Sequence, residues 1–555
     1  MKYNRVSRRM FLQGAGGALL PIPFLSSLLP RAAWAQSTGV PPRRFVSFVH
    51  DSGLGHPSNF FPNLSGNRFS MTKVGRVLSQ GAGLPDVHYE ALSSFVASTQ
   101  TSLSPIFGSA LNPYLNQINL YKGLDTPYVG LHNANYLGNL GTGGFGLGDY
   151  GTQFPTTPAS MSFDNLLNRN RRFNPKALAH RNFGHFDFKC SVVVDSSGGY
   201  SFAPEVGRTN LQLYNAIFGV NGGNVPETSG QTVTSVDHPR RGLLTSVLDD
   251  WRRVMNHPSL SAGDRRALSD ATDAFSDVER GLAGSSSTKG ICRHRNLSPD
   301  TLDYYYNGII ESQMRTTADI ISAGIMCEAI STLNFSHTPG VENGNNFHQV
   351  WQHRPVLYDQ QMANHLGPRI RAFLGRLLGN LSSSIDPANG KNYLYNTLVY
   401  YSMEFGPGSH HGACRPVLVA GNGGGGLNTG YYLDYSNRTL NRRPGYFQNN
   451  DEYDAPGSPS GEMWIGEIFN RIFVTMAQAM GLQPSDYEDP RLWQFFAGRG
   501  DMGVQNQNLT NIGGYGSPGP HIVAPNGANA TYYQYYNLSE FKKPLAHPTT
   551  SLYTG

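Results

Sequence analysis

Short apolar runs that end in polar, glycine-containing segments recur along the chain after about residue 40. Residues 43–50, RRFVSFVH, are rich in β-branched and aromatic side chains and lead directly into the glycine-containing segment Asp51–Pro57. Such runs predict buried strands. The same pattern predicts further strands at 118–124, 331–336, 396–402 and 415–420, and the strand at 396–402 leads to Glu404.

Segments with helical periodicity alternate with these strands. In 264–283 one face is formed by the apolar residues Leu268, Ala271, Phe275, Val278 and Leu282, with charged residues between them. Helices are also predicted at 243–256, about 313–330, 356–380 and 464–482. Ser162–Leu167 is typical of a capped helix start.

Strands that alternate with helices predict an α/β fold with a central, mostly parallel sheet flanked by helices. The two helices at about 240–285 indicate a helical hairpin inserted into this domain, which we expect to span 36–500. Residues 501–555 are rich in Gly, Asn and Tyr, and we expect an irregular C-terminal tail. The tyrosines of 532–536 are interpreted as tail packing, or alternatively as a carbohydrate-stacking surface.

The composition favours a protein that works outside the cytoplasm. Hydrophobic residues make up 39% of the 555 residues, charged residues only 15%, and there are 64 Gly and 35 Pro. Low charge with many loop-forming residues is typical of a loop-rich exported protein. The net charge of +5 comes from the first 35 residues, so the rest of the chain is neutral and shows no basic footprint for nucleic acid.

The first residues carry an export signal. Ser7-Arg8-Arg9-Met10-Phe11-Leu12 matches the twin-arginine pattern; an apolar stretch and Ala33-Trp34-Ala35 follow. We expect a signal peptide at 1–35 that is recognised by the twin-arginine export machinery and cleaved after Ala35. The mature protein is then periplasmic or secreted, with no stable membrane span, because the apolar stretch is short and interrupted.

The cysteines show no metal-binding spacing. They stand at Cys190, Cys292, Cys327 and Cys414, without a C-x-x-C pair. Because the twin-arginine route exports folded proteins, we expect at most one or two disulfides. Cys414 follows His411 closely, but a buried structural thiol is the simpler interpretation.

Several segments in a fixed order resemble the HXXSHH family of secreted bacterial proteins, a domain of unknown function. They are the twin-arginine leader, RRFVSFVHDSG, INLYKGLD, QMRTTADIISAGIMCEAISTLNFS, FHQVWQHR, NTLVYYSMEFG, SHH, RPVLVAGNGGGG and FNRIFVTMAQAMGL. The resemblance extends more distantly to the alkaline phosphatase and sulfatase fold, which implies metal ligands at strand ends. The stretch His348–His353 keeps the outer histidines of the signature, with Trp351 and Gln352 in place of its serine and a histidine.

Acids and histidines follow the predicted strands. The candidate metal ligands are Asp51, His348, His353, Glu404, His410 and His411. Carboxylate and imidazole ligands suit a divalent ion such as zinc, manganese or calcium. The alternative interpretation is that these side chains cap strands and hydrogen-bond the loops.

Two functions remain open at this point. One is a metal-dependent hydrolase of phosphate or sulfate esters, with Ser52, Thr126 or Thr142 as the candidate nucleophile or with direct attack by water. The other is a non-catalytic cell-envelope or secreted protein that binds a small molecule or polysaccharide. The glycines of 421–426 lack the Lys-Ser/Thr of a phosphate loop, so we expect a turn there and no nucleotide cofactor.

Overall fold

The computed structural model describes part of the chain. The described residues are 42–55, 57–62, 72–74, 87–98, 102–125, 137, 161–185, 190–194, 200–218, 311–337, 341–342, 345–346, 355–386, 388–407, 415–441, 464–487, 522–523, 529–530 and 544–545. The leader, the expected helical hairpin at about 240–285 and most of the expected tail lie outside them.

The chain divides into two compact units. The larger comprises Pro41–Leu213, Pro299–Ile385 and Lys391–Gly555. The other comprises Met1–Val40, Tyr214–Ser298 and Asp386–Gly390. All contacts discussed below lie within the larger unit.

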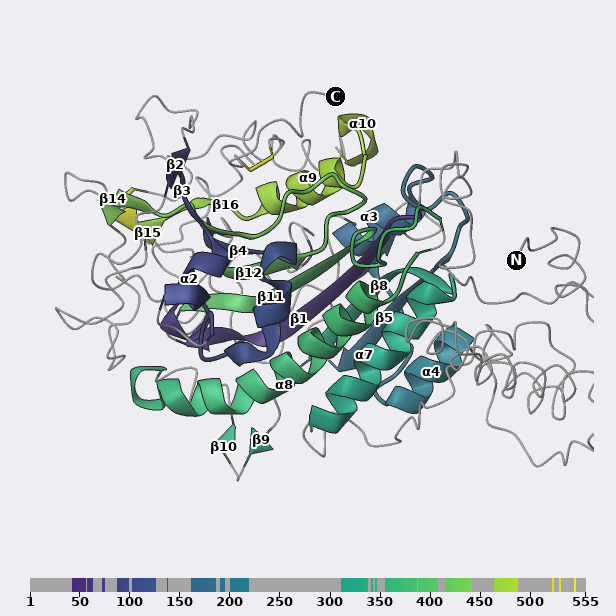
Figure 1. The fold of residues 1–555 in the computed structure, drawn as a ribbon, viewed down its shortest axis with the longest axis horizontal. Helices are drawn as coiled ribbons and strands as arrows, with labels where there is room; N and C mark the ends of the chain where they lie inside the picture. Colours follow the sequence, from purple (N-terminus) through teal and green to yellow (C-terminus); the bar gives the residue numbers. More distant parts are fainter. Residues whose placement is uncertain are drawn as a thin grey trace, which may run out of the picture. The chain divides into compact units, whose positions relative to one another are not determined.

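A mixed, mostly parallel sheet of ten strands forms the centre of the larger unit (Figure 1). Its order is β2-β3-β13-β4-β12-β11-β1-β8-β5, with β16 also paired to β4. The neighbours β5, β8, β1 and β11 are all parallel, whereas β12 and β3 run against their neighbours. The carboxyl ends of the parallel strands therefore meet at one edge of the sheet.

The strands of the sheet have these bounds: β1 Arg44–Gly55, β2 Thr72–Val74, β3 Val87–Ala91, β4 Ile118–Asp125, β5 Ala179–His185, β8 Ile330–His337, β11 Thr397–Pro407, β12 Arg415–Ala420, β13 Tyr431–Asp434 and β16 Glu467–Ile468. The small two-stranded ladders use β6 Val192–Val194 with β7 Tyr200–Phe202, β9 Val341–Glu342 with β10 Asn345–Asn346, β14 Asn437–Asn441 with β15 Trp464–Ile465, and β17 Ile522–Val523 with β18 Asn529–Ala530. The helices are α2 Leu92–Ser98, α3 Phe163–Arg169, α4 Asn210–Phe218, α7 Glu311–Met326, α8 Pro355–Ser383, α9 Asn470–Ala479 and α10 Pro484–Tyr487, with 3-10 turns η3 Pro57–Asn59 and η4 Gly108–Gln117.

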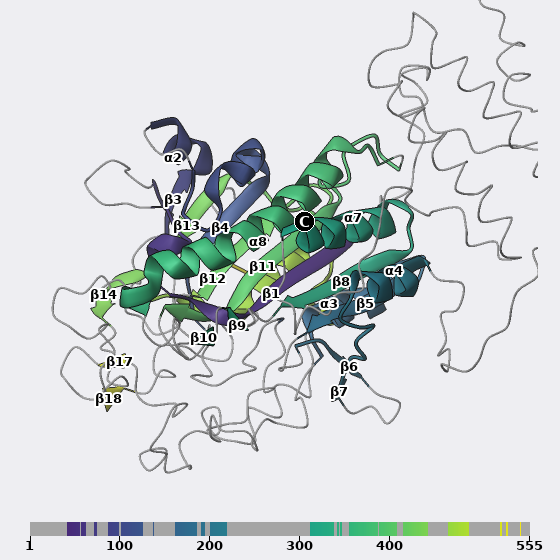
Figure 2. The ribbon, with the colours of Figure 1, turned by 90° about the horizontal axis from the view of Figure 1, so that it is seen from below.

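Helices cover both faces of the sheet. The long α7 and α8 pack against each other on one face, and α3 and α9 lie on the other (Figures 1 and 2). On the α8 face, Phe373 packs against Phe48 of β1 and Phe335 of β8, with ring centroids 4.5 Å and 5.1 Å apart. Each such ring removes a large apolar surface from water and so holds the helix on the sheet.

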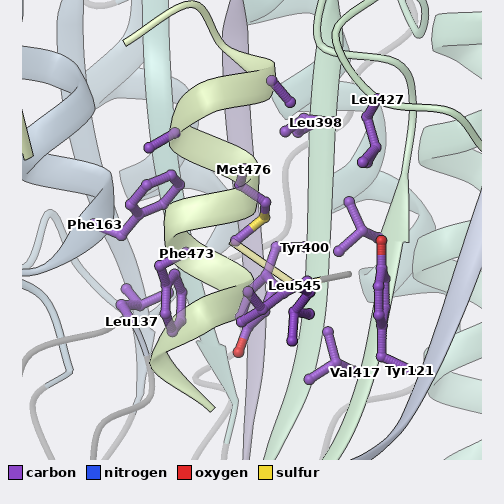
Figure 3. Packing of buried hydrophobic residues seen from close by; sticks show 14 of the residues in the cluster. Tyr121, Leu137, Phe163, Leu398, Tyr400, Val417, Leu427, Phe473, Met476 and Leu545 are labelled. Carbon is purple, nitrogen blue, oxygen red and sulfur yellow. The ribbon is translucent and has the colours of Figure 1, made fainter. Parts of the chain in front are cut away.

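The opposite face is filled by one apolar cluster. Phe473 and Met476 of α9 point toward Tyr400 and Val417 of the sheet, with Phe163 of α3 beside them (Figure 3). The ring centroids of Phe473 lie 5.4 Å from Phe163 and 5.5 Å from Tyr400. Aromatic and aliphatic side chains from elements far apart in the sequence thus form a continuous core.

The predicted strands and helices within the described residues are confirmed, with four differences. Ser162 stands at the N-cap position of α3, but its hydroxyl makes no capping hydrogen bond. The helix predicted at about 313–330 ends at Met326, because β8 begins at Ile330. The segment predicted as a loop from Asp51 continues β1 to Gly55, with a shift of register against β11 between His50 and Gly53. The helix predicted at 464–482 begins only at Asn470, because 467–468 pair with β4. At Gly466 an added Cβ would lie 1.7 Å from the carbonyl oxygen of Gly123, so this backbone approach requires glycine.

Candidate functional site at the carboxyl edge of the sheet

Asp51 and Glu404 lie on the neighbouring parallel strands β1 and β11, each one residue beyond a register pair. His50 of β1 is the register partner of Met403 in β11, and Asp51 and Glu404 are the next residues along each strand. The register shifts between His50 and Gly53, so Asp51 and Ser52 together stand against Glu404. Two acidic residues that are 353 positions apart in the sequence thus reach the carboxyl edge of the sheet on adjacent strands. Open α/β sheets form their sites at this edge.

The four predicted histidine ligands lie outside the described residues. The described flanks show where their segments begin and end. The segment with His410 and His411 leaves β11 after Pro407 and returns at Arg415 of β12, both at this edge. The segment with His348 and His353 follows β8, which also ends there, and precedes α8. Of the candidate nucleophiles, Ser52 lies in β1, whereas Thr126 and Thr142 are outside the described residues.

A buried arginine holds the end of β11 in place. Arg415 is fully buried, and its guanidinium donates from Nη2 to the carbonyl oxygen of Met403 at 2.8 Å. Its Cζ also lies 4.2 Å from the ring centroid of Phe469. The cation thereby fixes the backbone one residue before Glu404, and it brings positive charge to an edge with acidic residues.

Buried charges continue along the same edge beyond β12. Lys122 at the end of β4 lies 4.0 Å from the carboxylate of Asp434 at the end of β13. Glu467 of β16 pairs with Arg471, four residues further on in α9. Charges this deeply buried are tolerated because they are paired. They give this edge a strongly polar lining on the β4 side.

A different polar network lies under α3, and the sequence patterns did not indicate it. Asp164 accepts hydrogen bonds from the hydroxyls of Ser162 and Ser191, the latter at 2.5 Å, and its Oδ2 lies 3.2 Å from Nε2 of His180. Nδ1 of His180 lies 2.9 Å from Oγ1 of Thr332. This order of acid, imidazole and hydroxyl resembles a hydrolase relay, but Thr332 is fully buried within β8. The network therefore fastens α3 to the sheet.

A second group of buried amides and hydroxyls joins the parallel strands. Ser47 of β1 donates to Oδ1 of Asn334 in β8 at 2.8 Å, and Nδ2 of Asn334 donates to Oδ1 of Asn182 in β5 at 2.9 Å. Cys190 lies beside them as a buried free thiol, 3.3 Å from Oγ of Ser336. Burial raises the pKa of this thiol to about 12, which makes it a poor nucleophile. Cys190 is therefore a structural thiol, whereas Cys414, for which the sequence predicts that role, lies outside the described residues.

The glycine run 421–426 forms the predicted turn. Gly421, Gly423, Gly424 and Gly425 all have positive φ, between 59° and 96°. A Cβ at Gly426 would lie 2.0 Å from the carbonyl oxygen of Ala479, so the turn packs tightly against the end of α9. Close backbone packing accounts for these glycines without a phosphate.

The described residues contain no group of three or more His, Cys, Asp or Glu side chains arranged to hold a metal ion. The side chains of Asp51 and Glu404 are outside that search, and so are the four histidines of the predicted set. Among the helices of the described part, none is both long and apolar enough to cross a membrane.

Comparison with known proteins identifies neither a family nor a function for the chain. No family model matches the chain, and no curated protein matches it. Two solved structures align with 82% of this chain and 76% of theirs at 10% identity: the crystal structure of Ps i-CgsB, with a TM-score of 0.29, and its complex with k-i-k-neocarrahexaose, with a TM-score of 0.28. TM-scores this low do not establish a shared fold, so no property of that protein is carried over.

Proposed function

We propose that the protein is an exported, metal-dependent hydrolase of phosphate or sulfate esters with an alkaline-phosphatase-like sheet. The observation that carries this proposal is that Asp51 and Glu404 stand on adjacent parallel strands at the carboxyl edge of the sheet, each one residue beyond the register pair His50 and Met403. Neighbouring acids at this edge of a parallel sheet are suited to hold a divalent cation. The export signal at Ser7–Gln13 supports the location.

The donor set fits such an ion. Asp51 and Glu404 would supply oxygen ligands, and His348, His353, His410 and His411 would supply imidazole nitrogens from segments that leave or enter the sheet at the same edge. A bound divalent ion polarises the phosphoryl or sulfuryl oxygen and lowers the pKa of water.

In the reaction, the oxygen of water bonds to phosphorus or sulfur while the ester oxygen leaves and takes a proton as the alcohol. Arg415 serves this site by holding the end of β11, and hence the backbone beside Glu404, through its bond to Met403.

The test is the metal content of the exported protein together with its esterase activity. We expect about one equivalent of zinc, manganese or calcium per chain, because a preorganised site retains its ion through purification. Asp51→Asn and Glu404→Gln should lose the ion and the hydrolysis of 4-nitrophenyl phosphate or 4-nitrophenyl sulfate. Glu311→Gln, the same change on an exposed side chain of α7, is the matched control.

Two outcomes separate the proposal from its alternative. Metal below about a tenth of an equivalent in the wild-type protein would overturn the proposed site, since a site coupled to folding binds tightly. Bound metal without turnover of either ester would favour a non-catalytic binding protein. That second candidate is supported by Trp351 and Gln352, which replace a serine and a histidine of the family signature.

A further inference from the structure

Two histidines meet face to edge on the α8 side of the sheet. His50 of β1 and His337 of β8 are register partners on neighbouring parallel strands, so their side chains emerge on the same face. Their ring centroids are 4.7 Å apart at an interplanar angle of 87°. His50 is fully buried and His337 is 2% exposed. Neither histidine belongs to the ligand set predicted from the sequence.

Helix α8 brings two more nitrogen-bearing side chains to the same place. His365, Arg369 and Phe373 are four residues apart and share one face of the helix. Phe373 packs on Phe48 and Phe335, which lie two residues before His50 and His337 on their strands. Because α8 returns between the parallel strands β8 and β11, Arg369 and His365 lie one and two turns closer to the carboxyl edge, over the two strand histidines.

His50 is a buried imidazole whose ring nitrogens are not hydrogen-bonded within the described part of the chain. Among the described residues neither of its ring nitrogens has a hydrogen bond, although the side chain is wholly shielded from solvent. Buried polar groups are nearly always hydrogen-bonded, because burying one without a bond is costly. An imidazole ring offers at least one N–H donor in either of its protonation states, so His50 can donate to a bound group.

Among the described side chains, the ionised group that acts on His50 is a cation. Arg369 is the ionised group that acts on both His50 and His365. The acid that acts on Arg369 is Glu311 of α7, whose half-exposed carboxylate lies 3.4 Å from Arg315. An arginine beside imidazole N–H groups disfavours a cation and favours an anion with several acceptor oxygens.

We infer that His50, His337, His365 and Arg369, here called the α8 basic cluster, bind a tetrahedral oxyanion, either phosphate or sulfate. Arg369, whose Nη1 donates to the carbonyl oxygen of His365 at 3.2 Å, supplies the charge and further guanidinium donors, and His50 supplies an imidazole N–H donor. The orphaned nitrogens of His50 mark where the anion completes the hydrogen bonding. This site goes beyond the proposed hydrolysis, since it needs neither a metal ion nor turnover.

The experiment titrates the metal-free protein, kept in a chelator, with inorganic phosphate and separately with inorganic sulfate. Binding is measured by calorimetry and by the ring ¹⁵N signals of histidine-labelled protein, in which His50→Gln assigns the His50 signals. We expect saturable shifts of the His50 signals and an affinity at least about tenfold lower in Arg369→Met, because charge-assisted bonds to the anion are lost. Arg376→Met is the control, since Arg376 lies on the same helix but pairs with Asp319 of α7.

Arg369→Lys keeps the charge without the fork and gives a second variant if Arg369→Met does not fold; its binding should be weaker than wild type for both anions. Binding of only one anion supports the site and names its ligand. Unchanged His50 signals with both anions, or equal affinities in Arg369→Met and Arg376→Met, would overturn the inference. Because the protein is metal-free throughout, these results are independent of whether Asp51 and Glu404 support hydrolysis.

Discussion

Asp164 places its Oδ2 atom 3.2 Å from Nε2 of His180, and this contact joins the first turn of α3 to strand β5. Asp164 is completely buried, and the hydroxyls of Ser162 and Ser191 also donate to it. A carboxylate in such a place is tolerated only while its partners remain. We therefore expect this contact to contribute strongly to the packing of α3 on the sheet.

Replacing Asp164 with alanine should destabilise the fold strongly. The change leaves two hydroxyls and an imidazole without their acceptor, and each buried polar group left unsatisfied costs about 1–3 kcal/mol. Urea unfolding followed by circular dichroism measures the loss. Glu311→Ala, which removes an exposed carboxylate of the i,i+4 pair with Arg315, should cost no more than about 0.5 kcal/mol. Equal losses in the two variants would contradict the role given to the network.

Stability should fall as the pH drops below about 6.5, the ordinary histidine value. Burial lowers the pKa of His180, against the opposing effect of Asp164, and burial followed by Arg369 lowers the pKa of His365 to about 3. Below about pH 6.5, His180 and His365 therefore bind protons in the unfolded chain but stay neutral in the folded chain. Full stability is present above the unfolded pKa, and each such histidine removes at most about 1.4 kcal/mol per pH unit below it.

Urea unfolding at several values between about pH 7.5 and 5 tests this slope, because carboxylates contribute little in that window. His365→Leu should flatten the profile, since one titrating group is removed. A profile that is level down to pH 5 would show that these histidines are solvated in the folded protein.

Removing the metal should lower the melting temperature of the proposed metalloprotein. An ion that binds only the folded chain stabilises it by about 2.7 kcal/mol when its free concentration is about 100 times its dissociation constant. Calorimetry with and without a chelator measures the effect, and adding the ion back should reverse it. Asp51→Asn should melt at the same temperature in both conditions, whereas an equal response of wild type and variant would place the ion elsewhere.

Two glycine-to-alanine changes should act in opposite directions. Gly466→Ala brings a methyl group to 1.7 Å from the carbonyl oxygen of Gly123, so β16 must move from β4 at a cost of at least about 1–3 kcal/mol. Gly375→Ala on α8 meets only Ala110 at an ordinary 3.6 Å, and it should stabilise by up to about 1 kcal/mol through helix propensity. Chemical unfolding of the two variants gives the signs, and a loss at Gly375 would mean that α8 packs more tightly there.

The sequence predicts the strands that are apolar on both faces. β12 shows a continuous apolar run because it is buried on both faces, whereas β1 and β8 are equally buried but include polar residues such as Ser47 and Asn334, which hydrogen-bond to each other. β5, with the sequence AHRNFGH, was missed because His180 and Asn182 are satisfied by hydrogen bonds within the sheet and under α3, which no local pattern reveals. The short β13 was missed because its pairing with β4 lies more than 300 positions away in the sequence.

The residues of the candidate site also fall into those that the sequence predicts and those that only the folded chain reveals. Asp51 and Glu404 are recognisable because each directly follows an apolar run, and the parallel pairing of those runs follows from the alternation with helices. The contact of His50 with His337 depends on the register of β1 against β8. Register is decided by packing across the whole sheet, so these histidines could be found only in the folded chain.

The antiparallel entry of β12 has one more consequence. Because β12 pairs back onto β11, residues 408–414 start and finish on adjacent strands, and the ladder between those strands is complete without them. Doubling the length of such a connection costs only about 0.6 kcal/mol of closure entropy. The sheet therefore does not depend on the sequence of the segment with His410 and His411. Related chains can carry a different segment at this position, and hence different chemistry at the same edge, without a change in the fold of the sheet.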